Sequence, residues 1–432
     1  MNAARRLFID VSYTRTQTGN VGITRTVRRM TDALRALEAE ASLSCAPVSF
    51  HTSGFRLSPA AAIAGPSSAK PGSPARLFRW LSSGRIRTAL SLCVPLPWLH
   101  AAWALTTRAT FDGVSAGEAP VEFRAGDWLI LADESWNYRA WLAAEKARQR
   151  GVKVVLVLYD LIPLRQPQFC APLFTRVFYG WLRQMLKHSD AIMCISAATE
   201  KDLHAYAKEH VLALPGTGHF RLGSDVPVAN SAPVRNVVQA FLSADGPCFA
   251  AIGTIEPRKN YSMLLTVFER LWTRGVDARL LLAGRPHPDC ELLVERMMVH
   301  PEQGRRLLTL LDASDSEINL AYSECSALLF PSLAEGFGLP LVEARARGCT
   351  VIASALPALL ELKDEGVHFF KPDSADELEA LILDQASAPV RHRPQPPRTV
   401  TWRESATQFL AEVRRLASAP VGMAEEAAAV RN

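Results

Sequence analysis

The residues best suited to chemistry lie in the stretch EGFGLPLVE, Glu335–Glu343, which follows the apolar run Ala327–Phe330. That run has the composition of a buried strand, and Pro340 suits the first turn of a helix. The free N–H groups of such a helix attract phosphate, and Gly336 and Gly338 would let the backbone come close to a diphosphate. The pattern therefore predicts a strand-to-helix turn that binds phosphate.

Two carboxylates frame this turn. Glu335 precedes it and could accept hydrogen bonds from sugar hydroxyls, whereas Glu343 lies in the first part of the helix and could reach a ribose. The alternative interpretation is structural: Glu343 complements the helix dipole, and the glycines only turn the chain.

A pair of cations, Arg258 and Lys259, follows the apolar run Cys248–Gly253. Two fixed positive charges beside a leaving diphosphate would stabilise the negative charge that builds there in the transition state. In most proteins an Arg-Lys pair is simply solvated, but a position directly after a buried strand favours a binding role.

Polar residues also follow a strand-like run in the amino-terminal half. Asp160 comes soon after Val154–Leu158 and could contact a sugar, or it could cap the next turn. In the glycine-containing loop Thr18–Arg25, Gly22 is expected at a helix entrance. Arg25, one turn later, could reach a phosphate or an acceptor, although the neighbouring arginines are also typical of an ordinary basic helix face.

The elements that must position these residues are strands alternating with helices, which predicts two parallel α/β sheets. Ligands of such sheets bind at the carboxyl ends of the strands, where the polar residues above are expected. The predicted strands are Leu7–Val11, Trp128–Ala132, Val154–Leu158, Ala191–Ile195, Cys248–Gly253, Arg279–Ala283, Ala327–Phe330 and Thr350–Ala353, and a closing helix is predicted at Trp402–Leu416.

A chain of 432 residues is expected to form two domains, since single cores rarely grow beyond roughly 250–300 residues. Pro215, Gly216 and Gly218, with the mixed stretch that follows them, are interpreted as the separation between the two halves. The predicted parts are an amino-terminal domain at 1–235 with an insertion at about 54–120, a carboxyl-terminal domain at 236–395, and a linker, closing helix and loose tail at 396–432.

Composition argues against several classes of protein. The net charge of +5 is small and no long basic block is present, so nucleic acid is not an expected partner. The eight cysteines are far apart and lack zinc-ligand spacing, and no secretory leader opens the chain, so a cytoplasmic protein without a metal is expected. The basic, aromatic segment 76–108 could lie on a membrane surface as a peripheral anchor, or it could pack internally.

Several motifs together resemble glycosyltransferase family 4. The stretch Glu335–Glu343 resembles the signature of that family, and Gly253–Asn260 resembles its donor loop. Tyr159–Leu164 is similar to a His-Asp-Leu-Ile-Pro-Leu stretch in bacterial polysaccharide mannosyl- and rhamnosyltransferases, with Tyr159 standing where histidine is usual. Cys194–Thr199 and the glycine loop Thr18–Arg25 also resemble family turns. The motifs occur in the family's order, and the resemblance covers nearly the whole chain except about 54–120.

The resemblance implies a GT-B fold, in which two Rossmann-like domains face each other across a cleft and a carboxyl-terminal helix packs back. It implies catalytic roles for Asp160, Arg258, Lys259 and Glu335, and acceptor contacts for Arg25, Tyr159 and Asp160. The donor contacts that it implies are Gly22, Gly253, Arg258, Lys259, Glu335, Gly336, Phe337, Gly338, Leu339 and Glu343.

The implied activity is retaining transfer of a sugar from a nucleotide diphosphate donor to a glycan or lipid-linked glycan acceptor, in surface polysaccharide (O-antigen) synthesis, without metal or cofactor. GDP-mannose is the expected donor, and dTDP-rhamnose and UDP-hexoses are the alternatives. Two other functions stay open: a GT-B sugar-nucleotide epimerase, and a non-catalytic scaffold of a glycan assembly complex.

Overall fold

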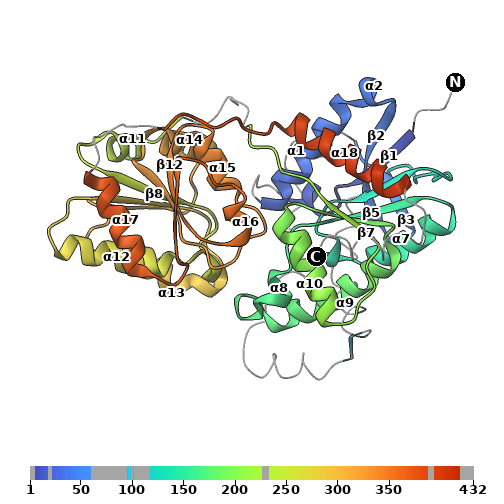
Figure 1. The fold of residues 1–432 in the computed structure, drawn as a ribbon, viewed down its shortest axis with the longest axis horizontal. Helices are drawn as coiled ribbons and strands as arrows, with labels where there is room; N and C mark the ends of the chain where they lie inside the picture. The colour runs from blue at the N-terminus through green and yellow to red at the C-terminus, as the bar shows by residue number, and fades with distance from the viewer. Residues whose placement is uncertain are drawn as a thin grey trace. The chain divides into compact units, whose positions relative to one another are not determined.

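Two separate β-sheets organise the chain, one in each of two units of the computed structural model (Figure 1). Unit 1 comprises Met1–Gly223 and Thr401–Asn432, and unit 2 comprises Ser224–Val400. The structure describes residues 5–17, 22–59, 95, 96, 98, 101, 117–225, 233–387 and 394–418. Most of the predicted membrane segment 76–108, and residues 18–21 of the predicted glycine loop, lie outside the described residues.

The sheet of unit 1 has the strand order β3-β2-β1-β4-β5-β6-β7. Neighbouring strands are parallel except β2 and β3, which form an antiparallel pair at the edge. The strands are β1 (Arg5–Asp10), β2 (Leu43–His51), β3 (Gly54–Leu57), β4 (Trp128–Leu131), β5 (Lys153–Leu158), β6 (Ala191–Cys194) and β7 (Gly216–His219). The central strands β4 and β6 are buried along their whole length because helices cover both faces of a parallel sheet.

The helices of unit 1 pack through apolar faces onto this sheet. The face of α1 carries Val27, Met30 and Leu34, all buried, at the helical spacing that the sequence shows. The helices are α1 (Gly22–Ala36), α2 (Glu38–Ala41), α7 (Ala140–Gln149), α8 (Ile162–Arg165), α9 (Pro172–His188), α10 (Ala197–Glu209) and α18 (Trp402–Ser418), with short 3₁₀ turns η1 (Thr14–Thr16), η2 (Ser135–Asn137) and η3 (Pro167–Phe169).

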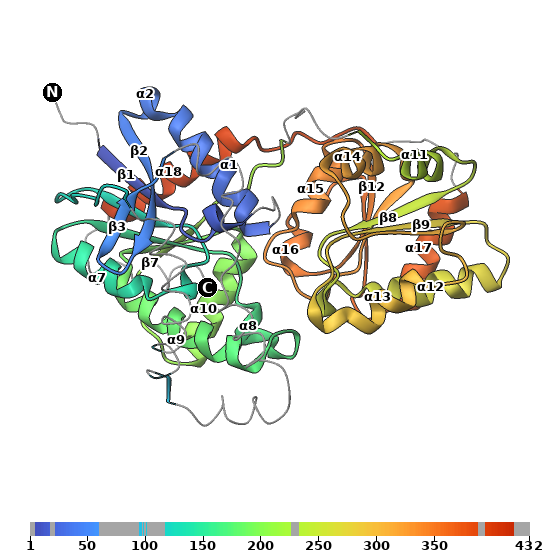
Figure 2. The same ribbon diagram turned by 180° about the vertical axis from the view of Figure 1, so that it is seen from behind.

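The carboxyl-terminal helix α18 packs back onto unit 1, beside α1 and β7, as predicted (Figures 1 and 2). The rings of Phe220 and Phe409 meet edge to face at 5.1 Å. A side chain at Gly218 would place its Cβ 2.5 Å from a carboxylate oxygen of Glu412. Gly216 and Gly218 themselves belong to β7, and the absence of a side chain at Gly218 leaves room for the Glu412 side chain of α18. The two units divide after Gly223, within the stretch that the sequence interpreted as the separation.

The sheet of unit 2 is parallel throughout, with the order β10-β9-β8-β11-β12-β13. Its strands are β8 (Cys248–Ile252), β9 (Arg279–Ala283), β10 (Leu307–Leu310), β11 (Ala327–Phe330), β12 (Thr350–Ser354) and β13 (Val367–Phe370). Its helices are α11 (Asn236–Ser243), α12 (Tyr261–Thr273), α13 (Glu291–Met298), α14 (Asp315–Glu324), α15 (Leu339–Arg345), α16 (Pro357–Leu360) and α17 (Ala375–Ser387), with short turns η4 (Pro257–Lys259) and η5 (Pro288–Cys290).

Helices cover both faces of the unit 2 sheet. The pair α12 and α17 packs on one face, whereas α11, α14 and α15 pack on the other (Figure 2). Phe249, Leu264, Phe268 and Leu280 belong to the core between the sheet and α12, and each is fully buried. Both units are thus Rossmann-like α/β folds, which confirms the predicted fold class.

Five strands, β2, β3, β7, β10 and β13, were not predicted from the sequence. The predicted insertion at about 54–120 begins inside β3, and its far end returns to the same edge: Val121 N–H donates to the Phe55 carbonyl at 2.9 Å. In the described part of the chain, no helix combines the length and the apolar character that crossing a membrane requires.

Candidate functional site

The strand order reverses once in each sheet, between β1 and β4 in unit 1 and between β8 and β11 in unit 2. The loops that leave the two strands at such a point turn to opposite faces of the sheet, so ligands of α/β folds bind there. In unit 2 the loop after β8 carries Arg258 and Lys259, and the loop after β11 carries Glu335. The structure therefore places three of the predicted residues at the reversal point of unit 2.

These three side chains form one buried network of ion pairs. Lys259 Nζ lies 2.5 Å from Glu335 Oε1, and Arg258 Nη1 lies 3.1 Å from Glu335 Oε2. Arg258 Nη2 also pairs with Glu256 Oε1 at 2.7 Å, and Lys259 Nζ lies 4.8 Å from the centre of the Phe330 ring. The side chains of Lys259 and Glu335 are only 11% and 8% exposed, so water screens their attraction little.

Burial and pairing oppose each other in this network. Burial lowers the pKa of Lys259, and the carboxylate of Glu335 partly offsets that shift. Burial alone would raise the pKa of Glu335, but Lys259 and Arg258 outweigh it, and the pKa of that carboxyl is lowered. Each charge is thus stabilised by its partner, which fixes two cations and a carboxylate in one place.

The backbone of the loop after β8 is held against the loop after β9. Gly253 has φ +146°, a conformation that side chains disfavour, and its carbonyl accepts a hydrogen bond from Tyr261 Oη at 2.9 Å. A Cβ at Gly284 would lie 1.7 Å from that same carbonyl oxygen. Close approach of the two loops therefore requires glycine at position 284.

The turn after β11 leads into a helix, as predicted, but two of its predicted donor contacts have buried side chains. Helix α15 begins at Leu339 behind Gly338, whose φ is +120°, and Gly336 precedes them in the same turn. Phe337 is 4% exposed, so its side chain packs in the protein interior. Glu343 is also buried and accepts a hydrogen bond from Tyr322 Oη at 3.1 Å.

The other predicted residues belong to unit 1. Tyr159 is buried, and its hydroxyl donates to the Ala132 carbonyl at 2.6 Å, so this side chain ties β5 to the end of β4. Asp160 Oδ1 accepts the N–H of Ile162 at 3.0 Å, which is the capping contact that the sequence left as an alternative. Gly22 opens α1 as expected, and Arg25 is half-buried on that helix.

Sequence reasoning missed a cluster of carboxyl groups at the reversal point of unit 1. Asp10 ends β1, and Asp133 and Glu134 closely follow β4. Burial, reinforced by Asp133, raises the pKa of Asp10 to about 7. Burial likewise raises the pKa of Asp133 to about 6 and that of Glu134 to about 8. These carboxyl groups could have been found from the sequence, because each lies within three residues of the end of a predicted strand.

The contacts of Glu256, Tyr261 and Tyr322 were also not predicted. Glu256 and Tyr261 lie in the same stretch as the residues they contact, whereas Tyr322 meets Glu343 only because α14 packs beside α15. Among the described residues, no group of His, Cys, Asp and Glu is arranged to hold a metal ion.

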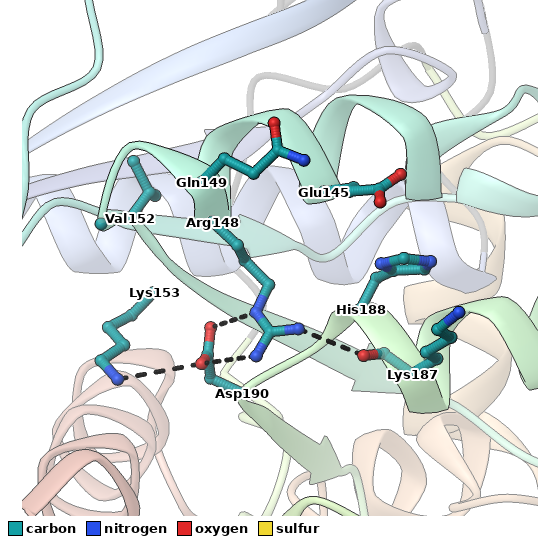
Figure 3. Close-up of a pocket in the computed structure, with 9 residues that line it drawn as sticks. Glu145, Arg148, Gln149, Val152, Lys153, Lys187, His188 and Asp190 are labelled. Carbon is teal, nitrogen blue, oxygen red and sulfur yellow. Dashed lines mark hydrogen bonds and ion pairs between the residues drawn. The ribbon is translucent and has the colours of Figure 1, made fainter.

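A pocket of about 460 Å³ lies elsewhere in unit 1, near the start of β5 (Figure 3). Arg148 and Lys153 line it and both pair with Asp190, at 3.3 and 3.8 Å, while Arg148 also donates to the Lys187 carbonyl at 3.1 Å. No residue predicted from the sequence lines this pocket.

Comparison with known proteins relates the chain to sugar transferases. Residues 237–394 match the family of glycosyl transferases group 1. The chain is 30% identical over 324 residues to the serotype-specific mannosyltransferase WbdA of Escherichia coli, across 72% of this chain and 40% of that protein. It is 28% identical over 141 residues to the O-antigen chain mannosyltransferase RfbU of Salmonella typhimurium, across 33% of this chain and 39% of that protein. The chain thus spans about 40% of the length of these relatives.

Two solved structures share the fold at low identity. Sucrose-phosphate synthase from Thermosynechococcus elongatus aligns with a TM-score of 0.60 and 17% identity, over 96% of this chain and 100% of that one. The catalytic domain of starch synthase IV from Arabidopsis thaliana aligns with a TM-score of 0.57 and 13% identity, over 97% of this chain and 100% of that one. These likenesses show the GT-B fold that the sequence predicts.

Proposed function

We propose that this chain, which belongs to the group 1 glycosyltransferases, transfers mannose from GDP-mannose to a glycan or lipid-linked glycan acceptor with retention at the anomeric carbon. The observation that carries the proposal is the network of Arg258, Lys259 and Glu335 at the reversal point of unit 2. A buried lysine and a partly buried arginine held by one carboxylate are suited to a diphosphate leaving group.

The network explains how the donor would be activated. Negative charge builds on the β-phosphate as the bond from the anomeric carbon to the phosphate oxygen breaks, and Arg258 and Lys259 would stabilise it. Glu335 holds both cations, and its oxygens have further lone pairs that can accept hydrogen bonds from sugar hydroxyls. Glu335 would thus orient both the transferred sugar and the two cations that bind the leaving group.

Retention would follow from attack on the face that the leaving group vacates. In this step the acceptor oxygen bonds to the anomeric carbon, the bond to the phosphate oxygen breaks, and the acceptor proton passes to that phosphate oxygen. No protein nucleophile and no metal takes part in the proposed step. The acceptor is proposed to be a glycan of surface polysaccharide synthesis, and the protein is proposed to act in the cytoplasm, peripherally on the membrane if residues 76–108 bind lipid.

The donor is tested by a thermal-shift screen of the purified chain against GDP, UDP, dTDP and their sugars, since ligands that bind only the folded state raise its stability. Selective stabilisation by GDP and GDP-mannose is expected. Stabilisation by UDP or dTDP compounds alone would replace mannose as the donor sugar, and stabilisation by none would favour the scaffold function. Proton NMR of the transfer product then reports the anomeric configuration, and an inverted linkage would refute the proposed mechanism.

A further inference from the structure

The loops at the reversal point of unit 1 hold buried carboxyl groups. Asp10 and Asp133 are 0% and 1% exposed. Their oxygens accept hydrogen bonds from the protein itself, Asp10 from Ser12 and Asp133 from Tyr13 and Thr14. Both carboxyl groups therefore hold the loops at the edge of the sheet where α/β folds bind ligands.

We propose that Asp133 is a positioning residue for the acceptor: it fixes the turn Tyr13–Gln17 so that an acceptor sugar can bind at the carboxyl edge of the unit 1 sheet. This inference rests on the proposed function, because only a transferase requires an acceptor.

Asp133 holds the turn through three donors. Its Oδ2 accepts the N–H groups of Tyr13 at 2.8 Å and of Thr14 at 2.7 Å. Its Oδ1 accepts the Thr14 hydroxyl at 3.0 Å and the N–H of Glu134 at 2.9 Å. Hydrogen bonds to a charged acceptor are stronger than neutral ones, so this carboxylate joins the loop after β1 firmly to the loop after β4.

Two arginines also hold the same turn. Arg28, on α1, donates from Nη2 to the carbonyls of Thr14 at 3.2 Å and Gln17 at 2.8 Å. Arg15, within the turn, forms a buried ion pair with Glu118 at 2.8 Å. The turn is thus fixed from three sides at the edge where α/β folds bind ligands. Rigid support of this kind is what a binding loop needs if it is to present one conformation.

Asp127 provides a matched control, because it precedes β4 whereas Asp133 follows it. It is 4% exposed, and its carboxylate accepts from Arg6 Nε at 2.9 Å and from the N–H of Arg124 at 2.7 Å. Asp127→Asn and Asp133→Asn therefore remove comparable buried contacts from opposite ends of the same strand. Only the second change affects the carboxyl edge.

The experiment measures transfer from GDP-mannose to a mannose-terminated oligosaccharide by the full chain and both variants. Asp133→Asn is expected to lower kcat/KM for the acceptor by ~10- to 100-fold, mainly through KM, because small displacements of a positioning group cost this much. The Kd for GDP-mannose should stay within about twofold of wild type, since unit 2 is unchanged. Asp127→Asn should keep the wild-type KM for the acceptor even where it lowers the melting temperature.

Thr14→Val removes only the hydroxyl contact with Asp133, so it should raise the acceptor KM by a smaller factor than Asp133→Asn. It replaces Asp133→Asn as the test if that variant does not fold. An active wild type with an unchanged acceptor KM in Asp133→Asn, or in Thr14→Val where only that variant folds, would overturn the inference and leave the proposed function standing. Equal losses in Asp127→Asn, or a matching rise in the Kd for GDP-mannose, would also overturn it. A wild type that transfers no sugar from any donor would overturn the proposed function and this inference together.

Discussion

Removing one partner of the Lys259–Glu335 pair should destabilise unit 2 strongly. At 2.5 Å and an effective dielectric constant of about 20, two unit charges attract by ~7 kcal/mol before desolvation is counted. Desolvation costs several kcal/mol per ion, and loss of one partner from such a pair typically lowers stability by ~3–5 kcal/mol. Glu335→Leu leaves Lys259 without its carboxylate, so it should lose an amount in that range, whereas Lys259→Met should lose less because Glu335 keeps Arg258 as a partner at 3.1 Å. The double variant leaves no unpaired charge at either position, so it should lose clearly less than Glu335→Leu.

The assay is a double-mutant cycle on the full chain, with hydrogen exchange of the β8 and β11 amides reporting the opening of unit 2. Arg258 keeps Glu256 as a partner at 2.7 Å in all variants, and it loses Glu335 in both Glu335→Leu and the double variant. That loss therefore cancels when these two variants are compared. Asp376→Asn is the control, because its ion pair with Arg270 has side chains 92% and 48% exposed and should contribute less than about 1 kcal/mol. Losses in the single variants that simply add in the double variant would refute the pairing argument.

Tyr322→Phe removes a hydrogen bond to the buried carboxylate of Glu343, and should lower the free energy of unfolding by ~1–3 kcal/mol in urea; an unchanged value would contradict a supporting role for Tyr322. Gly284→Ala would place a Cβ 1.7 Å from the Gly253 carbonyl, so binding of GDP by calorimetry should be lost; wild-type affinity would show that the loop can move aside without cost. The pKa of Asp10 is raised to about 7 from 3.8, so its contribution to stability is present below about pH 4 and is lost as the pH rises towards 7. Asp10→Asn should therefore flatten the fall in unfolding free energy between about pH 4 and 7, and a slope identical to wild type would contradict this.

Much of the fold could be predicted because buried parallel strands are short runs of apolar residues. The runs at β4, β5, β8 and β11 are of this kind, and the structure contains each of them. The strand β7 could not be predicted in this way, since its sequence, GTGH, has almost no apolar side chain. A side chain at Gly216 or Gly218 would press against Leu416 or Glu412 of α18, which is distant in sequence. The strand β10 did have a readable signal in its leucines.

The site residues could be predicted because they closely follow strands, but their contacts could not. Sequence order does not tell which loops are neighbours, and Lys259 meets Glu335 only because β8 pairs with β11. The same limit hid the link between Asp133 and the turn at Thr14, which depends on β1 pairing with β4. The burial of Phe337 and Tyr159 likewise depends on packing that the motifs do not report.

The most direct test of the donor site is transfer of radiolabelled mannose from GDP-mannose to a mannose-terminated oligosaccharide. Loss of one cation should reduce kcat by ~10²–10³-fold in Lys259→Met, with Arg270→Gln at an exposed position as the control that keeps wild-type activity. The account predicts that the wild type and the control are active and that Lys259→Met and Glu335→Gln lose activity. Wild-type rates in either site variant would contradict it.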